Sequence, residues 1–396
     1  MTERPPSTRR PALMLPDGTG GLAPFTPMYR PVAPPAAPHR WVRRALAAAH
    51  VVADPLVDAD PASGGAIDRD ATLAFRRHLL DLGFGIAEAM DTAQRGMGLD
   101  WPAARSLIGD TLAEAGPERR DRIWCGVGTD HLPDAPAEPH SIATAWIEQM
   151  HAVQHMGGRV IVMASRALSR SARTPRDYAT TYARVLAEAD QPVILHWLGD
   201  MFDPALTGYW GSRDLDEAAD LVAELIATHA ARIDGIKMSL LDAGREVALR
   251  RRLPPGVRMY TGDDFHYPEL IAGDGEGHSD ALLGILDPIA PVAAAALAAQ
   301  AAGDMAGYHA ALAPTVPLAR RMFCAPTRFY KTGVVFLAWL NGHQRHFTML
   351  GGAHSMRSLP HLADLFRLAD AAGLLADPDL ACNRMRRLLA LHGVAT

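Results

Sequence analysis

Short apolar runs alternate with longer amphipathic runs along most of the chain. The short runs are rich in Val, Ile and Leu and are bounded by Gly, Asp or Pro, which is typical of buried strands. The longer runs repeat apolar residues at helical spacing, and some begin at a capping residue such as Asp100 or Thr174. The pattern predicts strands at 51–57, 84–90, 121–128, 159–165, 191–199, 233–239, 257–262 and 280–286. It predicts long helices at 68–83, 100–116, 141–158, 174–190, 215–230 and 290–303, and short helices after the sixth and seventh strands.

This alternation of eight strands with helices predicts the fold class. A (β/α)₈ barrel, also called a TIM barrel, repeats the same unit over about 250 residues. A doubly wound open sheet would also alternate strands and helices, but the chain has no Gly-rich phosphate loop after its first strand, which favours the barrel. We therefore predict an α/β protein built on a (β/α)₈ barrel.

Composition divides the chain into three parts. Residues 1–47 are rich in Pro and Arg, and without the apolar segment of a secretory signal they are expected to form a poorly structured arm that packs on a neighbouring subunit. Residues 48–303 hold the predicted barrel. Residues 304–396 add further helical stretches and are predicted to form a C-terminal helical extension outside it.

Charge and cysteine content narrow the classes of partner. A formal net charge of −5 gives no basic surface for a nucleic acid, and no apolar run approaches the roughly 18 residues of a membrane span. The three cysteines are too few and too widely spaced for a disulfide framework or a zinc cluster, which is typical of a reducing compartment. We expect a cytoplasmic homodimer or homotetramer that acts on a small molecule and binds neither nucleic acid nor membrane.

Lysine is almost absent from the chain. Only two of the 39 basic residues are lysines, Lys237 and Lys331. Where arginine fills nearly every position that needs positive charge, a lysine is retained mainly for tasks that a guanidinium cannot perform, such as imine formation. Lys237 ends the sixth predicted strand, where a barrel places its catalytic groups. Lys331 lies in the extension, far from any predicted strand, and is expected to be structural.

The segment around Lys237 resembles a known enzyme superfamily. "DGIKMSLLDAG", followed by "GVRMYTGDDFHYPELIAGDGEGHSDALLGILDPIAP", is similar to the lysine strand and the Gly-Asp-Asp segment of the dihydrodipicolinate synthase and N-acetylneuraminate lyase superfamily. The resemblance extends over roughly residues 48–375. It implies class I aldolase or lyase chemistry, in which Lys237 forms an imine with the ketone of a 2-oxo acid. Because the iminium supplies the electron sink that a metal would otherwise provide, we expect no cofactor and no metal.

The chain departs from this superfamily at two places. Where the family carries a Thr-Thr pair, the chain has Thr92 followed by Ala93, whose backbone N–H could still meet a carboxylate. The fourth strand of the family ends in a tyrosine that relays protons, whereas this chain has Ser165 and Arg166 there. Asp91 or His196 could replace the missing tyrosine in proton transfer.

Other polar side chains follow the predicted strands and are expected to face the same barrel mouth. They are Glu88, Asp263, Asp264, His266, His278 and Asp280. Asp263 and Asp264 are also well placed to cap the following helix. The predicted catalytic residues are Lys237, His196 and Thr92. The predicted substrate-binding residues are Asp91, Ala93, Ser165, Arg166, Asp263 and Asp264.

The resulting hypothesis is a Schiff-base lyase, and two alternatives stay open. The lyase would make or break a carbon–carbon bond, or dehydrate, in a 2-oxo acid or a sugar-derived keto compound. The first alternative is a metal-dependent barrel isomerase or epimerase of sugars that uses His196, Asp263 and His266 as ligands, although no compact metal motif is present. The second is a non-catalytic barrel.

Overall fold

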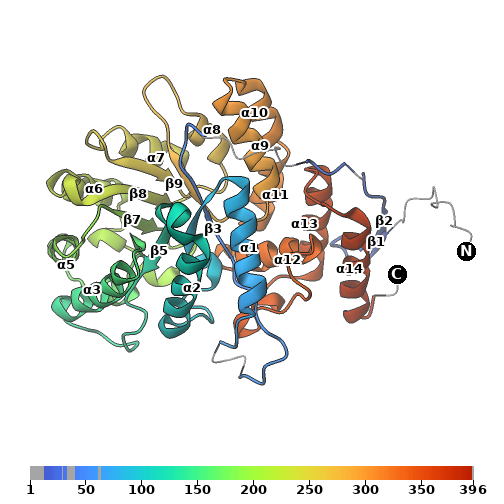
Figure 1. Cartoon of the computed structure of the whole chain (residues 1–396), viewed down its shortest axis with the longest axis horizontal. Coiled ribbons are helices and arrows are strands. Elements are labelled where there is room, and N and C mark those ends of the chain that lie inside the picture. Colours follow the sequence, from blue (N-terminus) through green and yellow to red (C-terminus); the bar gives the residue numbers. More distant parts are fainter. Residues whose placement is uncertain (1–12, 29, 34–40, 61–63, 395–396) are drawn as a thin grey trace, which may run out of the picture.

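Eight parallel strands close into a barrel in the computed structural model, which describes residues 13–28, 30–33, 41–60 and 64–394 (Figure 1). The order of the strands around the barrel is β10-β3-β4-β5-β6-β7-β8-β9, so neighbours in sequence are neighbours in space. Their bounds are β3 Ala45–Ala48, β4 Gly85–Glu88, β5 Ile123–Val127, β6 Arg159–Val162, β7 Val193–Leu198, β8 Ile233–Ser239, β9 Arg258–Thr261 and β10 Asp280–Leu283. The predicted (β/α)₈ barrel is confirmed.

Helices on the outside of the barrel cover its strands. Their bounds are α1 Arg69–Leu82, α2 Trp101–Arg119, α3 Pro139–His155, α4 Arg166–Ser171, α5 Pro175–Ala187, α6 Leu215–Thr228, α7 Ala243–Arg250, α8 Tyr267–Ala272 and α9 Ala290–Ala301. Capping residues fix the ends of these helices, as α1 illustrates. The Asp68 side chain accepts from the Ala71 N–H at the start of α1, and Gly83 ends this helix in the left-handed conformation at φ 109°. None of the described helices is both long and apolar enough to cross a membrane.

Alternate residues of each strand point into the barrel and fill it. The interior cluster includes Leu46, Ala87, Trp124, Ile161, Ile194, Tyr260 and Leu282. A larger apolar cluster lies between the strands and the surrounding helices. Because successive side chains of a strand alternate in direction, one residue decides whether a polar group faces the barrel interior or the helical layer.

The first predicted strand is wrong. The chain forms β3 at Ala45–Ala48, whereas residues 51–57, predicted as a strand, lie in the loop that follows. Three of the four residues of β3 are alanines, which have low strand propensity, so the segment carries no clear strand signal. Val51 and Val52 belong to this loop, but both are buried, and they form the apolar run that resembles a strand. The other predicted strands each overlap an observed one. The barrel therefore begins at Ala45, before the boundary expected at residue 48.

The described part of the N-terminal arm packs on the same chain. β1 (Leu13–Pro16) and β2 (Leu22–Phe25) form an antiparallel hairpin beside the C-terminal helices (Figure 1). The Phe25 and Phe366 rings meet edge to face at 5.8 Å, and Arg367 donates to the Pro16 carbonyl at 2.8 Å. The expectation of an unstructured arm on a neighbouring subunit is thus wrong for this hairpin, and residues 1–12 lie outside the described part.

The C-terminal extension forms helices α10 Met305–Leu312, α11 Thr315–Met322, α12 Tyr330–Leu340, α13 Leu359–Ala371 and α14 Pro378–Leu391. Helices α11 to α14 gather on one side of the barrel (Figure 1). Every residue of α12 is buried, because this helix lies between the barrel and the other helices of the extension. The extension is therefore part of the core and covers one side of the barrel closely.

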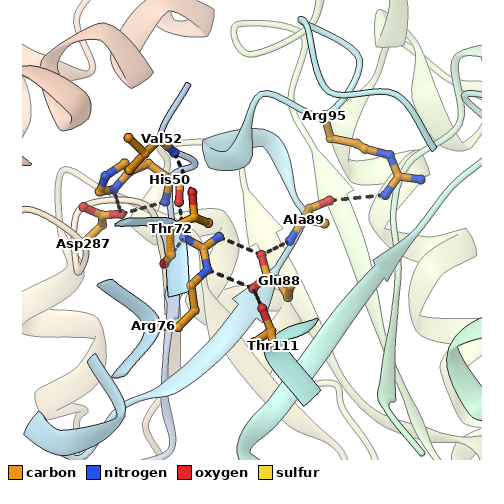
Figure 2. A network of polar contacts seen from close by, with 9 residues as sticks. All are labelled: His50, Val52, Thr72, Arg76, Glu88, Ala89, Arg95, Thr111 and Asp287. Atoms are coloured by element: carbon orange, nitrogen blue, oxygen red, sulfur yellow. Dashed lines mark hydrogen bonds and ion pairs between the residues drawn. The ribbon is translucent and has the colours of Figure 1, made fainter. Parts of the chain in front are cut away.

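A buried ion pair lies behind the second strand. Both side chains of the pair, Arg76 of α1 and Glu88 of β4, are 0% exposed. Arg76 donates from Nη2 to Glu88 Oε1 at 2.8 Å and from Nε to Oε2 at 3.0 Å, and Thr111 of α2 donates to Oε2 at 2.7 Å (Figure 2). Glu88 was expected to face the barrel mouth. It points into the helical layer instead, because Ala87 on the same strand occupies the interior.

A buried acid in α7 predicts a pH-dependent stability. Burial raises the pKa of Glu246 from 4.5 to about 8, although the Ser279 hydroxyl donates to it at 2.7 Å. Because the pKa of Glu246 is higher in the folded protein than in the unfolded chain, protonated Glu246 favours the folded state. This contribution to stability is complete below pH 4.5 and is lost as pH rises through 8. Wild type should therefore lose on the order of 2–4 kcal/mol relative to Glu246→Gln between pH 5 and pH 8.5. Urea denaturation at both pH values measures this difference, and Glu224→Gln on the exposed face of α6 is the control. Equal pH dependence of the wild type and Glu246→Gln would contradict a buried neutral acid.

Candidate active site

An open cleft lies at the carboxyl ends of strands β4 to β7. It encloses about 260 Å³. The residues around it include Asp91, Arg95, Thr129, Asp130, Met163, Arg166, Arg170, His196, Leu198 and Asp203. Carboxyl ends of barrel strands carry the catalytic groups in barrel enzymes, so this cleft is the candidate active site.

Lys237 lies on β8, in register with His196 on β7 and Tyr260 on β9. Its side chain is 8% exposed. Burial lowers the pKa of the Lys237 amine, and the Asp91 and Asp264 carboxylates oppose this shift. Gly262 makes room for the amine chain, since a Cβ at this position would lie 2.9 Å from Lys237 Cε. The residues that line the open cleft include His196 on the adjoining strand and do not include Lys237.

His196 is completely buried and borders the cleft. Its Nε2 lies 3.3 Å from the Ser239 hydroxyl, while its Nδ1 has no hydrogen-bond partner in the described part of the chain. Burial and the nearby Lys237 amine hold the pKa of His196 well below its usual 6.5. A neutral imidazole with one unpartnered nitrogen can accept or donate one proton, or hold a bound reactant.

Asp264 follows β9, and its carboxyl group interacts electrostatically with the Lys237 amine. Burial raises the pKa of Asp264 to about 7, although Ile285 donates its backbone N–H to the carboxylate at 2.9 Å. The Lys237 amine lowers this pKa less than burial raises it. Because burial disfavours the charged form of both groups, it favours a neutral amine at Lys237 and a neutral carboxyl group at Asp264.

Thr92 belongs to the short 3₁₀ turn η2 (Asp91–Ala93) after β4. Its hydroxyl lies 2.8 Å from the hydroxyl of Tyr330, the first residue of α12, and both are buried. The Ala93 N–H, expected to meet a substrate carboxylate, already donates to the Met90 carbonyl at 3.0 Å. Ala93 is thus unavailable to a ligand in this structure, whereas Asp91 lies at the cleft.

Three arginine–aspartate pairs form the rim of the cleft. Arg95 meets Asp130 through two hydrogen bonds of 2.7 and 2.8 Å. Arg166 donates to Asp203 at 2.5 Å, and Arg170 pairs with Asp134. Burial would raise the pKa of Asp130, but the hydrogen bonds and charge of Arg95 outweigh it and lower this pKa. The rim therefore presents guanidinium groups that are already balanced by carboxylates.

Two predicted substrate-binding residues stabilise turns instead. The Ser165 hydroxyl accepts from Leu168 N–H at 3.0 Å and caps α4. The Asp263 carboxylate accepts from the backbone N–H groups of Phe265 and His266 at 2.8 and 3.0 Å. Neither side chain borders the described cleft.

The ligand set of the metal alternative does not come together. Asp263 lies 2.9 Å from His266 Nδ1, but His196 contacts Ser239 on another strand. Over residues 13–394, apart from the undescribed gaps, no three His, Cys, Asp or Glu side chains are placed to hold an ion. His278 and Asp280, expected at the mouth, lie at the opposite end of the barrel, because β10 begins at Asp280. The structure thus gives no observation that favours the isomerase.

Two residues of α12 also lie beside the candidate site: Tyr330, which no sequence signal indicated, and Lys331, which was expected to be structural. Lys331 is 4% exposed, and its amine lies 3.3 Å from Met97 Sδ in the loop after η2. Burial lowers the pKa of Lys331 to about 8, against the opposing charge of Asp91. The expectation that Lys331 lies far from the strands is therefore wrong, since α12 brings it beside the cleft. The scarcity of lysine in the sequence singled out Lys237 and Lys331 equally, so it could have pointed to Lys331 as well.

A family model and several solved structures each match most of this chain. The model of a family described as "Protein of unknown function (DUF993)" matches residues 13–394. No curated protein matches the chain. Among solved structures, dihydrodipicolinate synthase from Thermotoga maritima is 16% identical, with a TM-score of 0.63 over 84% of this chain and 99% of that one.

Two further structures show the same likeness. YagE from Escherichia coli K12, a prophage protein of the dihydrodipicolinic acid synthase family in complex with pyruvate, is 15% identical, with a TM-score of 0.62 over 89% of this chain and 99% of that one. The synthase from Aquifex aeolicus is 13% identical, with a TM-score of 0.59 over 89% and 98% of the two chains. At such low identity the likeness establishes the fold, and at that level it confirms the predicted resemblance.

Proposed function

The chain belongs to the DUF993 family, and we propose that it is a class I lyase that forms a Schiff base through Lys237. In this proposal the substrate is a 2-oxo acid or a sugar-derived keto compound. The enzyme makes or breaks a carbon–carbon bond, or removes a hydroxyl group, next to the imine carbon. The observation that carries the proposal is a buried amine near the carboxyl end of β8, which interacts with the Asp91 and Asp264 carboxylates and lies on the strand next to His196, whose Nδ1 has no hydrogen-bond partner in the described structure.

The proposed chemistry begins with the amine of Lys237. Burial lowers its pKa, so a larger share of the amine is neutral and nucleophilic near pH 7. The amine adds to the ketone carbon, and the ketone oxygen leaves as water, which gives an iminium. The positive iminium withdraws electrons from the neighbouring carbon, so that a proton or a carbon group can leave while its bonding electrons form an enamine.

Two neighbouring groups have the properties that these proton transfers need. The carboxyl group of Asp264, with a pKa of about 7, can give the proton that turns the ketone oxygen into water. The neutral imidazole of His196 can accept the proton removed from carbon, because its Nδ1 has no partner in the described structure. In this proposal His196 takes the place of the tyrosine that β6 lacks.

The cleft supports a small, polar substrate. A volume of about 260 Å³ fits a compact oxo acid, and Arg166 at the rim can shift from Asp203 to a substrate carboxylate. Pyruvate is a suitable first probe, since the similar protein YagE is described in complex with it. Hydroxylated 2-oxo acids derived from sugars are the next class to test.

Borohydride trapping tests the proposal directly. Borohydride reduces an iminium to a stable secondary amine, so a protein that forms the imine gains one substrate-derived mass. We expect such an adduct with pyruvate or another 2-oxo acid, located by peptide mapping on the segment that contains Lys237. Borohydride without the oxo acid is the control. A panel of 2-oxo acids that leaves the mass unchanged would contradict the Schiff-base function.

A further inference from the structure

Tyr330 comes to the site from outside the barrel. It begins α12 in the C-terminal extension, is 4% exposed, and its ring stacks on Phe323 at 4.4 Å. Its hydroxyl lies 2.8 Å from Thr92 Oγ1 in η2, which is its hydrogen-bond partner in the described part of the chain. A residue of the extension and a residue of the second barrel loop, 238 positions apart, thus share one buried hydrogen bond.

The end of β10 leaves space for this pair. A Cβ at Gly284 would lie 3.0 Å from Tyr330 Cε2 and 3.4 Å from Thr92 Oγ1. The aromatic ring and the threonine hydroxyl therefore occupy volume that a side chain at position 284 would need. Three separate segments of the chain therefore meet at this contact.

Either hydroxyl of this pair could be the donor. If the phenol donates to Thr92, its own proton is paired, and a buried proton left unpaired would cost about 1–3 kcal/mol. Burial raises the pKa of Tyr330 well above 10, so the phenol keeps this proton. When Tyr330 donates, the proton of Thr92 is free to point to another acceptor.

We propose that Tyr330 is a positioning residue, which fixes the Thr92 hydroxyl so that Thr92 donates a hydrogen bond to the oxo acid bound at Lys237. This inference rests on the proposed lyase function. Asp91, which precedes Thr92 in η2, lines the same cleft as His196, the neighbour of Lys237 on the adjoining strand, so the turn lies at the end of the barrel where the reacting amine is. The C-terminal extension therefore completes the active site of its own barrel.

Deuterium exchange of pyruvate measures the effect without a second substrate. The iminium loses a proton from the methyl carbon to a base, the base exchanges it with D₂O, and the enamine takes up deuterium. Tyr330→Phe keeps the ring stacking but removes the donor. We expect exchange, followed by NMR, to slow about 10- to 100-fold, because positioned proton-transfer groups contribute about 10²–10⁴ in rate. Borohydride trapping at Lys237 should stay within about twofold.

Variants of Thr92 distinguish positioning from general stability. Thr92→Ser keeps the hydroxyl and should exchange at close to the wild-type rate, whereas Thr92→Val should be as slow as Tyr330→Phe. Because Tyr330 acts through Thr92, adding Tyr330→Phe to Thr92→Val should cause no further loss. Tyr308→Phe is the matched control, since this buried phenol of α10 donates to the Pro268 carbonyl at 2.8 Å. It should exchange at the wild-type rate.

The outcomes separate the two proposals. The role of Tyr330 is overturned if Tyr330→Phe exchanges deuterium at the wild-type rate. It is also overturned if Tyr330→Phe slows exchange as much in the Thr92→Val background as it does in wild type. In either case, trapping of the oxo acid at Lys237 would leave the lyase function intact. A wild-type protein that forms no imine with any oxo acid overturns the lyase function and this inference together. Should Tyr330→Phe fail to fold, equal rates for Thr92→Ser and Thr92→Val overturn the inference.

Discussion

Lys237→Arg should retain the fold and lose the proposed lyase activity. Arginine keeps the positive charge but stays protonated and cannot form an imine, so turnover of the oxo acid should fall on the order of 10⁴-fold or more. Borohydride with the oxo acid should then add no mass to the variant. Steady-state kinetics and intact mass of the same preparation measure both effects, and thermal unfolding checks the fold.

Two further variants make this result specific. Lys237→Met removes both the charge and the nucleophile. If the larger guanidinium of Lys237→Arg disturbs the space beside Gly262, Lys237→Met is used in its place. Lys331→Arg should still be labelled at Lys237, because no other lysine is present in the chain. Its turnover is not an inert control, since Lys331 lies beside Asp91. Full turnover by either Lys237 variant would leave the likeness to lyases as one of fold only.

The fold could be predicted from the sequence because its signal is periodic. Strands such as β8 are short, apolar and separated by capped helices, and the observed bounds Ile233–Ser239 coincide with the predicted ones. β3 could not be found, because a run of alanines has no strand propensity and the closing strand is held by pairing with β4 and β10. Pairing between distant segments leaves no local trace in the sequence.

The site could be predicted only where its residues end strands. Lys237 and His196 could be placed near each other from the sequence, because the carboxyl ends of parallel strands meet at one end of the barrel. Glu88 was misplaced because a shift of one position turns a strand residue from the interior to the helical layer. Tyr330 and Lys331 were missed because α12 reaches the mouth through packing of the whole extension, which no spacing in the sequence records.

The buried pair of Arg76 and Glu88 should be the most sensitive point for stability. Arg76→Met leaves the Glu88 carboxylate buried without its cation, and loss of one partner of a buried pair costs about 3–5 kcal/mol. Urea unfolding should report this loss. Arg76→Met combined with Glu88→Leu removes both charges and should recover most of the stability. Arg119→Met, which breaks the exposed pair with Asp81, is the control and should cost below about 1 kcal/mol.

This pair also contacts the backbone that leads into the turn of Thr92. Ala89 follows Glu88 with a φ of 55°, a left-handed conformation that costs a residue with a Cβ about 1–3 kcal/mol. Glu88 accepts from the Ala89 N–H at 2.8 Å, and Arg95 donates to the Ala89 carbonyl at 3.3 Å (Figure 2). Without the charged pair this turn should relax, so the double variant should recover stability but exchange deuterium more slowly than wild type. Wild-type exchange by the double variant would show that the pair stabilises the barrel without placing the active-site turn.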